Sequence, residues 1–192
     1  METMDNLEQK KIIKKIKKGD QQAFAQLVEE YKNRVYYVCF RMLGNRQEAE
    51  DATQETFLKV YMNIEQYDLS RTFSTWLFRI ATNVSIDRLR KKKPDYSLDA
   101  EIVGSDGQTM YQQLEADTRS PEIEVETMEV QAWVQEAIST LSPKYRIVIT
   151  LKYMNDLSLK EISEILDIPV ATVKTRIHRG REALRKKLRQ FT

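Results

Sequence analysis

The chain has 192 residues, with 31 lysines and arginines against 29 aspartates and glutamates, so its formal net charge is only +2. Glycine and proline are scarce, which favours helices, and a single cysteine, Cys39, excludes an internal disulfide and fits a reducing compartment. No apolar run approaches the roughly 18 residues that a membrane helix needs, and no signal peptide is recognisable, so we expect an all-α protein that works in the cytoplasm.

The first part of the chain predicts two helices joined by a tight turn. Residues 7–18 are basic and carry a weak apolar stripe, which predicts a short helix. Gly19 is expected to end this helix and Asp20 to cap the next one. Apolar residues then recur at three- and four-residue steps as far as Gly44, and this spacing predicts one long amphipathic helix.

Two further helices follow. Asn45 with Glu48 three residues later indicates a capping box. The inner positions of the helix that begins there are Ala49, Ala52, Phe57, Val60 and Ile64. Residues 63–70 are polar without a clear period and predict a loop. Residues 73–93 predict another long helix, which Pro94 ends.

The apolar pattern fails over residues 94–121, where acidic and small polar residues predict a linker. Helical spacing then returns, carried by Val130, Trp133, Val134, Ala137, Ile138 and Leu141. Ser142 and Pro143 indicate the cap and first residue of a further helix. The apolar positions of that helix are Ile147, Val148, Leu151 and Tyr153. Asn155 and Asp156 are expected to turn the chain.

The last part of the chain predicts a helix-turn-helix over about residues 158–187. Ser158 and Glu161 form a capping box for a short helix, and residues 167–169 form the turn. The final helix runs from Val170 to about residue 190. Its inner stripe consists of Val173, Ile177, Gly180, Leu184 and Leu188. A glycine on that stripe predicts the close approach of another helix backbone.

The opposite stripe of the final helix suits a major groove. It carries Thr172, Thr175, Arg176 and Arg179. Threonine and arginine reach base edges, and arginine favours guanine. The remaining cations are expected on phosphates, which position a protein without reading sequence: Lys174, Arg181, Arg185, Lys186 and Lys187. The alternative is a basic amphipathic helix in an ordinary helical bundle.

The charges of the chain fall into three blocks. Residues 71–93 hold seven lysines and arginines against one aspartate, a balance of +6. Residues 174–192 hold eight against one glutamate, a balance of +7. Between them, residues 94–128 hold nine acids and one arginine, a balance of −8. Two basic blocks separated by an acidic one predict two surfaces for a polyanion such as nucleic acid, and solvated helix faces are the alternative.

An acidic stripe lies beside the core stripe of the helix that begins near Asn45. Its members at helical spacing are Asp51, Gln54, Glu55, Leu58 and Met62. Acids with two apolar anchors, next to a strongly basic helix, predict docking of a protein partner that carries basic residues. The alternative is a solvated acidic helix face.

The helix over residues 73–93 carries polar residues opposite its core stripe: Thr75, Arg79, Thr82, Asn83 and Arg90. Aromatic residues lie among these cations: Tyr67, Phe73, Trp76 and Phe78. Aromatic rings beside arginines can receive unstacked bases while the cations hold the backbone. The alternative is that Phe73 and Trp76 only pack in the core, and for Trp76 we favour that interpretation.

The histidine and the cysteine of this sequence do not indicate a metal or catalytic site. His178 is the only histidine and has no ligand cluster near it, so we expect a surface or phosphate-contacting residue and no metal. Cys39 lies on an apolar stripe, which predicts a packed thiol with no catalytic role.

Three segments of the sequence resemble one known family. They are residues 51–57 (DATQETF), residues 73–83 (FSTWLFRIATN) and residues 172–182 (TVKTRIHRGRE). In this order they resemble the extracytoplasmic-function (ECF) group of the sigma-70 family of RNA polymerase sigma factors, over roughly residues 8–190. Residues 85–96 resemble the sigma-W type within that group.

The resemblance implies two small helical domains on an acidic linker. Residues 8–93 would be sigma region 2, residues 94–127 the linker, and residues 128–190 sigma region 4. It implies a transcription initiation factor of a stress regulon, with no enzymatic activity, no cofactor and no small-molecule substrate. The implied partners are core RNA polymerase (its beta-prime clamp helices and beta flap), promoter DNA and a membrane-anchored anti-sigma factor at the inner membrane face.

The resemblance also implies roles for particular residues. Polymerase docking falls to Asp51, Gln54, Glu55, Leu58 and Met62. Recognition and melting of the −10 element fall to Asn63, Tyr67, Arg71, Thr72, Phe73, Trp76, Arg79, Asn83, Arg90 and Lys91. Recognition of the −35 element falls to Thr172, Lys174, Thr175, Arg176, Arg179 and Arg181. The acidic linker would run through a positively charged channel of the polymerase.

One departure from the family concerns base stacking. Housekeeping sigma factors carry adjacent aromatics where this chain has Trp76 and Leu77, so we expect weaker melting and stricter promoter preference. Two other interpretations stay open on the residues alone. A helix-turn-helix regulator would bind duplex DNA without polymerase, usually as a dimer. A nucleic-acid enzyme would need metal-binding carboxylates or histidines, and no convincing constellation is visible.

Overall fold

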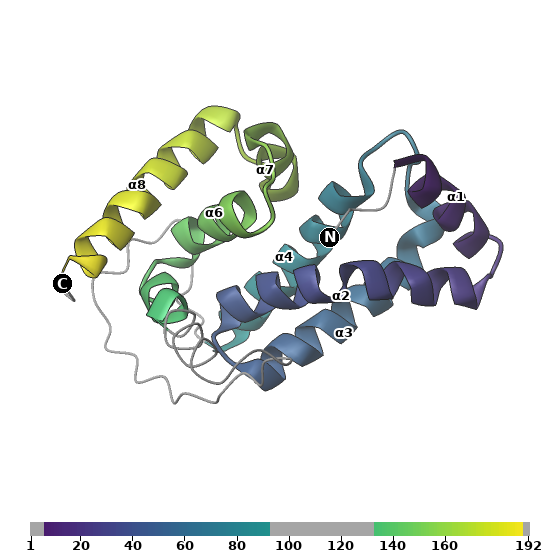
Figure 1. Cartoon of the computed structure of the whole chain (residues 1–192), viewed down its shortest axis with the longest axis horizontal. Helices are drawn as coiled ribbons and strands as arrows, with labels where there is room; N and C mark the ends of the chain where they lie inside the picture. The colour runs from purple at the N-terminus through teal and green to yellow at the C-terminus, as the bar shows by residue number, and fades with distance from the viewer. Residues whose placement is uncertain (1–5, 93–132, 190–192) are drawn as a thin grey trace, which may run out of the picture.

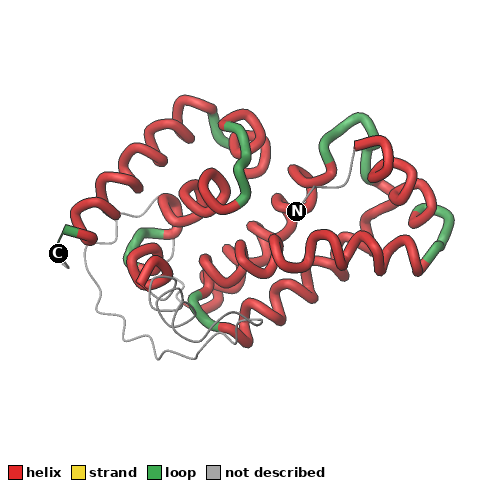
Figure 2. The backbone as a smooth tube through the Cα atoms, viewed as in Figure 1, coloured by secondary structure: helices red, strands yellow, loops and turns green. Residues whose placement is uncertain are grey.

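A computed structural model describes residues 6–92 and 133–189 of the chain, and every regular element within them is a helix (Figures 1 and 2). The helices form two units, one from each described segment. The predicted acidic linker, Pro94 and Val130 lie outside the described residues.

The first unit contains the four long helices that the sequence predicts, and one additional short one. These are α1 (Asn6–Ile16), α2 (Gln21–Leu43), α3 (Arg46–Asn63), the 3-10 helix η1 (Ile64–Gln66) and α4 (Phe73–Lys92). The Asp20 side chain caps α2 by accepting a hydrogen bond of 3.0 Å from Ala23 N. Gly44 ends α2 in the left-handed region at φ +71°, as its position in the sequence predicts.

The predicted loop over residues 63–70 is shorter in the structure than in the sequence analysis. Asn63 still belongs to α3, and η1 continues the chain for one more turn. The reason is Ile64, which is only 3% exposed. Burial of this side chain holds the backbone in a helical turn against the core, so the irregular segment begins only at Tyr67.

The core of the first unit forms where α2, α3 and α4 meet. The predicted inner positions of α3 are all buried, namely Ala49, Ala52, Phe57, Val60 and Ile64. They pack with buried residues of α2 and α4 that include Val35, Met42 and Leu77. Burying one such large aliphatic side chain contributes about 1.5–3 kcal/mol to stability, so this core holds the surface stripes of α3 and α4 in fixed register.

The second unit begins with helical residues 133–139 and continues with α6 (Pro143–Met154), α7 (Leu159–Leu166) and α8 (Val170–Leu188). The capping box at the start of α7 is complete, with Ser158 Oγ accepting from Glu161 N at 3.2 Å and Glu161 Oε2 accepting from Ser158 N at 2.8 Å. Asp167 then turns the chain in the left-handed conformation at φ +53°. The predicted helix-turn-helix is therefore confirmed.

Three apolar residues that the spacing placed on inner stripes are exposed. Trp133 is 45% exposed, Tyr153 49% and Leu188 40%. Tyr153 and Leu188 lie at the ends of α6 and α8, past the residues that neighbouring helices cover. Trp133 and Leu188 instead line a shallow hollow together with Ala137 and Lys187.

Gly180 has the close neighbour that its position predicts, but the neighbour is a side chain. A Cβ at Gly180 would lie 2.9 Å from Cγ1 of Ile149 on α6. Cβ of Tyr145, also on α6, would lie 3.5 Å away, so α6 passes close to Gly180 as predicted, and the branched Ile149 side chain makes the nearest contact.

The two units pack against each other, with α6 beside α2 and α7 beside α4 (Figure 1). Arg146 of α6 is buried and donates from Nη1 to the carbonyl of Met42 across this boundary at 2.6 Å. Its Nη2 donates to the carbonyl of Leu141 at 3.0 Å within the second unit. Arg41 of α2 donates to Oε1 of Gln135 at 2.6 Å. Arginines from both sides thus satisfy buried acceptors at this boundary.

Candidate nucleic-acid interfaces

The acidic stripe predicted on α3 exists as one surface. Asp51 and Gln54 are exposed, Glu55 is partly buried, and Leu58 and Met62 are 62% and 77% exposed. Leu58 and Met62 are four residues apart, so these two exposed apolar side chains lie next to each other on the helix surface. This α3 face therefore combines carboxylates with apolar anchors, as the sequence predicts.

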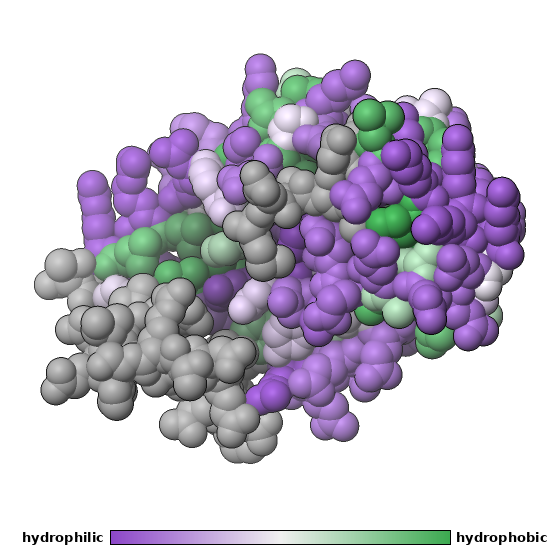
Figure 3. All heavy atoms as spheres, turned by 45° about the vertical axis from the view of Figure 1, so that its right-hand side comes forward, coloured by the Kyte–Doolittle hydropathy of each residue, from purple (hydrophilic) through white to green (hydrophobic). Residues whose placement is uncertain are grey.

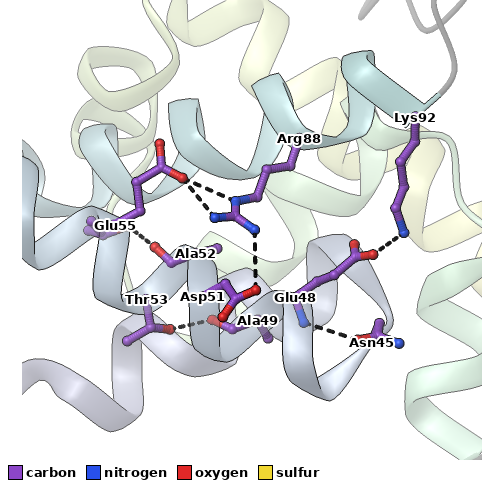
Figure 4. Close-up of polar contacts among 10 residues, drawn as sticks. Asn45, Glu48, Ala49, Asp51, Ala52, Thr53, Glu55, Arg88 and Lys92 are labelled. Atoms are coloured by element: carbon purple, nitrogen blue, oxygen red, sulfur yellow. Dashed lines mark hydrogen bonds and ion pairs between the residues drawn. The ribbon is translucent and has the colours of Figure 1, made fainter.

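Arg88 of α4 binds the carboxylates of this face (Figure 4). Its Nε and Nη2 donate to Oε2 of Glu55 at 3.2 and 2.9 Å, and its Nη1 lies 4.0 Å from Oδ2 of Asp51. Partial burial alone would raise the pKa of Glu55, but hydrogen bonds from Arg88 and Lys59 lower it below its ordinary value. Glu55, which is ionised at neutral pH, therefore stays ionised to lower pH than an ordinary glutamate.

Sequence reasoning missed Arg88 because its partner lies 33 residues earlier in the chain. A signal was nevertheless present. Arg88 continues the spacing of the α4 core stripe formed by Leu77, Ala81 and Val84, so it had to point toward α3.

The capping box predicted at Asn45 forms only in part. Oδ1 of Asn45 accepts from Glu48 N at 3.0 Å, as expected. The Glu48 carboxylate forms an ion pair with Lys92 at the end of α4 (Figure 4). A second basic residue of α4 is therefore bound to the acidic helix α3.

The aromatic residues predicted to receive unstacked bases are mostly buried. Tyr67 is 4% exposed, Phe73 1% and Phe78 0%, whereas Trp76 is only partly buried. The Tyr67 ring centroid lies 5.0 Å from that of Trp76 and 5.5 Å from that of Phe73. As placed, Tyr67, Phe73 and Phe78 lack free faces for stacking. The Tyr67 and Phe73 rings pack against each other and against Trp76, and burial raises the pKa of Tyr67 to about 12.

The polar stripe predicted on α4 is only partly exposed. Arg79, Asn83 and Arg90 are exposed, but Thr75 and Thr82 are 8% and 1% exposed, which corrects the predicted stripe. The reason is that α4 is covered on several sides, by α2, α3 and α7. The remaining predicted −10 residues are exposed at the end of α3, on the segment before α4 and on α4 itself: Asn63, Arg71, Thr72 and Lys91.

The α8 face forms as the sequence predicts. Lys174, Thr175, Arg179 and Arg181 are exposed, and Thr172 and Arg176 are partly buried beside them. Val173, Ile177 and Gly180 are buried on the opposite side of the helix. Figure 3 shows hydrophilic side chains over most of one face of the molecule, with smaller hydrophobic areas between them. The residues that suit base edges lie on one stripe of α8, and the cations that suit phosphates are accessible on the same helix beside its buried side.

Among the described residues, no group of histidine, cysteine and acidic side chains could hold a metal ion. Cys39 is fully buried, and burial raises the pKa of its thiol, as a packed cysteine predicts. None of the described helices is both long and apolar enough to cross a bilayer.

Comparison with family models divides the chain at the same place as the two units. The model of sigma-70 region 2 matches residues 27–94, and a model of sigma-70 region 4 matches residues 131–184. The first match contains the α3 face and α4, and the second contains the helix-turn-helix. The chain belongs to the sigma-70 family of RNA polymerase sigma factors, in its ECF group.

Known relatives match this ECF sigma factor over almost its whole length. It is 61% identical over 182 residues to the ECF RNA polymerase sigma factor SigW of Bacillus subtilis, covering 95% of this chain and 97% of the relative. It is 32% identical over 187 residues to an ECF RNA polymerase sigma-E factor of Haemophilus influenzae, covering 96% and 97%. The predicted family and function are therefore confirmed.

Solved structures share the fold. CnrH in complex with the cytosolic domain of CnrY matches with a TM-score of 0.70 at 23% identity, covering 98% of this chain and all of that one. The sigma factor RpoE of Bartonella quintana, in complex with the anti-sigma factor NepR, matches with a TM-score of 0.65 at 19% identity, covering 86% and 96%. The arrangement of helices in both units thus occurs in other proteins of distant sequence.

Proposed function

We propose that this ECF sigma factor docks on core RNA polymerase through the α3 face and reads two promoter elements with two separate helices. In this proposal residues 8–93 act as region 2, residues 94–127 as the acidic linker and residues 128–190 as region 4. The −10 element is bound by the segment before α4 and by Arg79 and Asn83, and the −35 element by α8.

The observation that carries the docking proposal is the exposure of Leu58 and Met62 beside ionised carboxylates. Apolar anchors surrounded by charge are the pattern of protein–protein hot spots. Glu55, which is bound by Arg88, and exposed Asp51 supply the charge complement for a basic surface of the polymerase. The beta-prime clamp helices are the proposed contact, and the beta flap is the proposed contact of region 4.

The docking proposal is tested with purified core polymerase. Replacing Leu58 and Met62 together by alanine should weaken binding to core by about tenfold or more, since each anchor contributes on the order of 1 kcal/mol or more. Leu7→Ala is the matched control, because Leu7 is also an exposed leucine at 68% but lies on α1. Equal binding of the double variant and the control would show that the α3 face is not the docking surface.

The −35 proposal rests on the shared face of α8, where Thr175, Arg176 and Arg179 can reach base edges. Arg179→Ala should lower the preference for the correct −35 sequence by about 1–3 kcal/mol at one base pair. Lys187→Ala should weaken binding to all sequences similarly and reduce its salt dependence, since a phosphate contact reads no base. Run-off transcription from promoters with single −35 substitutions separates these two outcomes.

We also propose that this protein acts by binding alone, without a catalytic step of its own. Incubation with single-stranded and duplex DNA plus magnesium should leave the DNA covalently unchanged. Duplex promoter should be shifted only when core polymerase is present, which separates this proposal from a free-standing helix-turn-helix regulator.

An anti-sigma factor at the inner face of the membrane is the proposed regulator, and the α3 face offers it a site. The related sigma factor RpoE of Bartonella quintana is known in complex with an anti-sigma factor. If a membrane-anchored anti-sigma factor covers the α3 face, the wild-type chain should fractionate with membranes before induction. The Leu58 and Met62 double variant should then be found in the cytoplasmic fraction under the same conditions.

A further inference from the structure

Lys17, directly after α1, reaches the segment that precedes α4. Its Nζ donates to the carbonyl of Glu65 at 2.9 Å and to the carbonyl of Tyr67 at 2.7 Å. These acceptors lie 48 and 50 residues later in the sequence. In Figure 1, α1 lies beside this segment at one end of the first unit.

Lys17 differs from its basic neighbours. Lys14, Lys15 and Lys18 are exposed, whereas Lys17 is partly buried. An ammonium group has three donors and no acceptor, so it can hold two carbonyls at once only if both point toward it. The position of Lys17 therefore restricts where the backbone between residues 65 and 67 can lie.

The helix from which the Lys17 side chain extends is packed against the core. Ile12, Ile13 and Ile16 of α1 are buried. Gln9, also on α1, hydrogen-bonds to the hydroxyl of Tyr31 on α2. The backbone of Lys17 donates to the carbonyl of Ile13 at 3.0 Å and extends the last turn of α1. The Lys17 side chain therefore extends from the end of a well-packed helix.

The segment that Lys17 holds is ordered by further local bonds. The hydroxyl of Tyr67 donates to the carbonyl of Arg71, and Ser70 N donates to Oδ1 of Asp68 at 2.9 Å. Arg71 N donates to the carbonyl of Asp68 at 3.0 Å. These bonds close the turn over residues 67–71, and Lys17 joins the turn to α1.

We infer that Lys17 is a positioning residue for −10 recognition: it presets the backbone of residues 65–67 so that the following turn and the start of α4 can capture a base. This inference rests on the function proposed above. Lys17 acts through the loop and needs no contact with DNA of its own. A preset loop cannot readjust to a base of another shape, whereas a flexible loop can, so selectivity among −10 sequences depends on it.

The experiment uses the full chain bound to core polymerase and a promoter library randomised at the −10 element. Lys17→Met removes the ammonium group and keeps most of the side-chain length. We expect it to lower the ratio of preferred to disfavoured −10 sequences by about tenfold, which corresponds to about 1.4 kcal/mol. Binding to core polymerase and preference at the −35 element should stay at wild-type levels. Lys17→Arg, which retains several donors, should restore much of the −10 ratio.

Two control variants separate positioning from general effects. Lys18→Met removes the same charge from the adjacent exposed position and should leave the −10 ratio unchanged. Ile16→Ala destabilises α1 while keeping the ammonium group. It should lower the melting temperature and change the −10 ratio only slightly. If Lys17→Met gives the same −10 ratio as Lys18→Met, the inference is wrong.

The two possible failures are distinguishable. If the wild-type chain itself shows no −10 preference in the library, the proposed function fails. If the wild-type chain is selective and Lys17→Met is equally selective, only the role of Lys17 fails.

Discussion

The two units of this sigma factor build their binding surfaces in different ways. The α8 face of the second unit is presented by one helix, with local caps and turns on either side. The surfaces of the first unit are assembled from distant segments: Arg88 reaches Glu55 across 33 residues, and Lys17 reaches Tyr67 across 50. We therefore expect −35 recognition to depend on how α8 packs in its unit. We expect docking and −10 recognition to depend on side-chain contacts between helices that are distant in sequence.

The largest effect is expected at the boundary where the units meet. Arg146→Ala removes a buried guanidinium that donates to the carbonyls of Met42 and Leu141. Leaving buried acceptors without a donor costs about 1–3 kcal/mol each, so we expect a loss of about 3 kcal/mol or more in the free energy of unfolding. Denaturant titration measures this, with exposed Lys160→Ala as the control. A change below 1 kcal/mol would mean that the boundary contributes little to stability.

The next largest loss of stability is expected where α8 packs against α6. Gly180→Ala places a Cβ 2.9 Å from Cγ1 of Ile149, a contact so short that the Ile149 side chain or one of the two helices must shift. The overpacking cost of about 1–3 kcal/mol outweighs or cancels the gain in helix propensity of about 1 kcal/mol, so stability should fall by up to about 2 kcal/mol. In an Ile149→Ala background the same Gly180→Ala substitution should cost less, because the side chain that the new Cβ meets has been removed. Gly180→Ala should lower both the melting temperature and the −35 selectivity. A fall in only one of them would contradict the proposal that packing on α6 positions α8.

A smaller loss of stability is expected when the ion pair between Arg88 of α4 and Glu55 of the α3 face is removed. Arg88→Ala should lower stability by about 1 kcal/mol at neutral pH, because the Arg88–Glu55 pair is partly exposed and screened by solvent. The folded pKa of Glu55 lies below its ordinary value of 4.5, so the contribution is complete above that value. It is lost as the pH falls through the lowered folded pKa. The difference between wild type and variant should therefore shrink in acid, as measured by urea titration at several pH values. A difference independent of pH would exclude the ion pair as its cause.

The smallest effects compare the two helix caps. Ser158→Ala removes half of a complete capping box, and Asn45→Ala removes a cap whose Glu48 already pairs with Lys92. Both caps are exposed, so each loss should lie at the low end of the range for N-caps, about 0.5 kcal/mol. We expect Ser158→Ala to reduce melting temperature and −35 binding, since its helix supports α8, and Asn45→Ala to reduce core binding instead. Thermal unfolding with both binding assays shows whether each cap acts within its own unit.

The sequence by itself determined the helices, their caps and the α8 face. These features depend on spacings of three and four residues and on residues such as Gly44, Ser158 and Asp167, whose effects are local. The stripe of Asp51, Leu58 and Met62 was predictable for the same reason. One helix period suffices to place such residues on a common face.

Only the tertiary structure decided which side chains remain free for binding. Thr75, Thr82, Tyr67 and Phe73 follow the expected periods, yet they are buried because helices from other parts of the chain cover α4. Arg88, Arg146 and Lys17 gain their roles from acceptors that lie many residues away in the sequence. Burial and long-range pairing depend on how whole helices pack, and no local pattern encodes that arrangement.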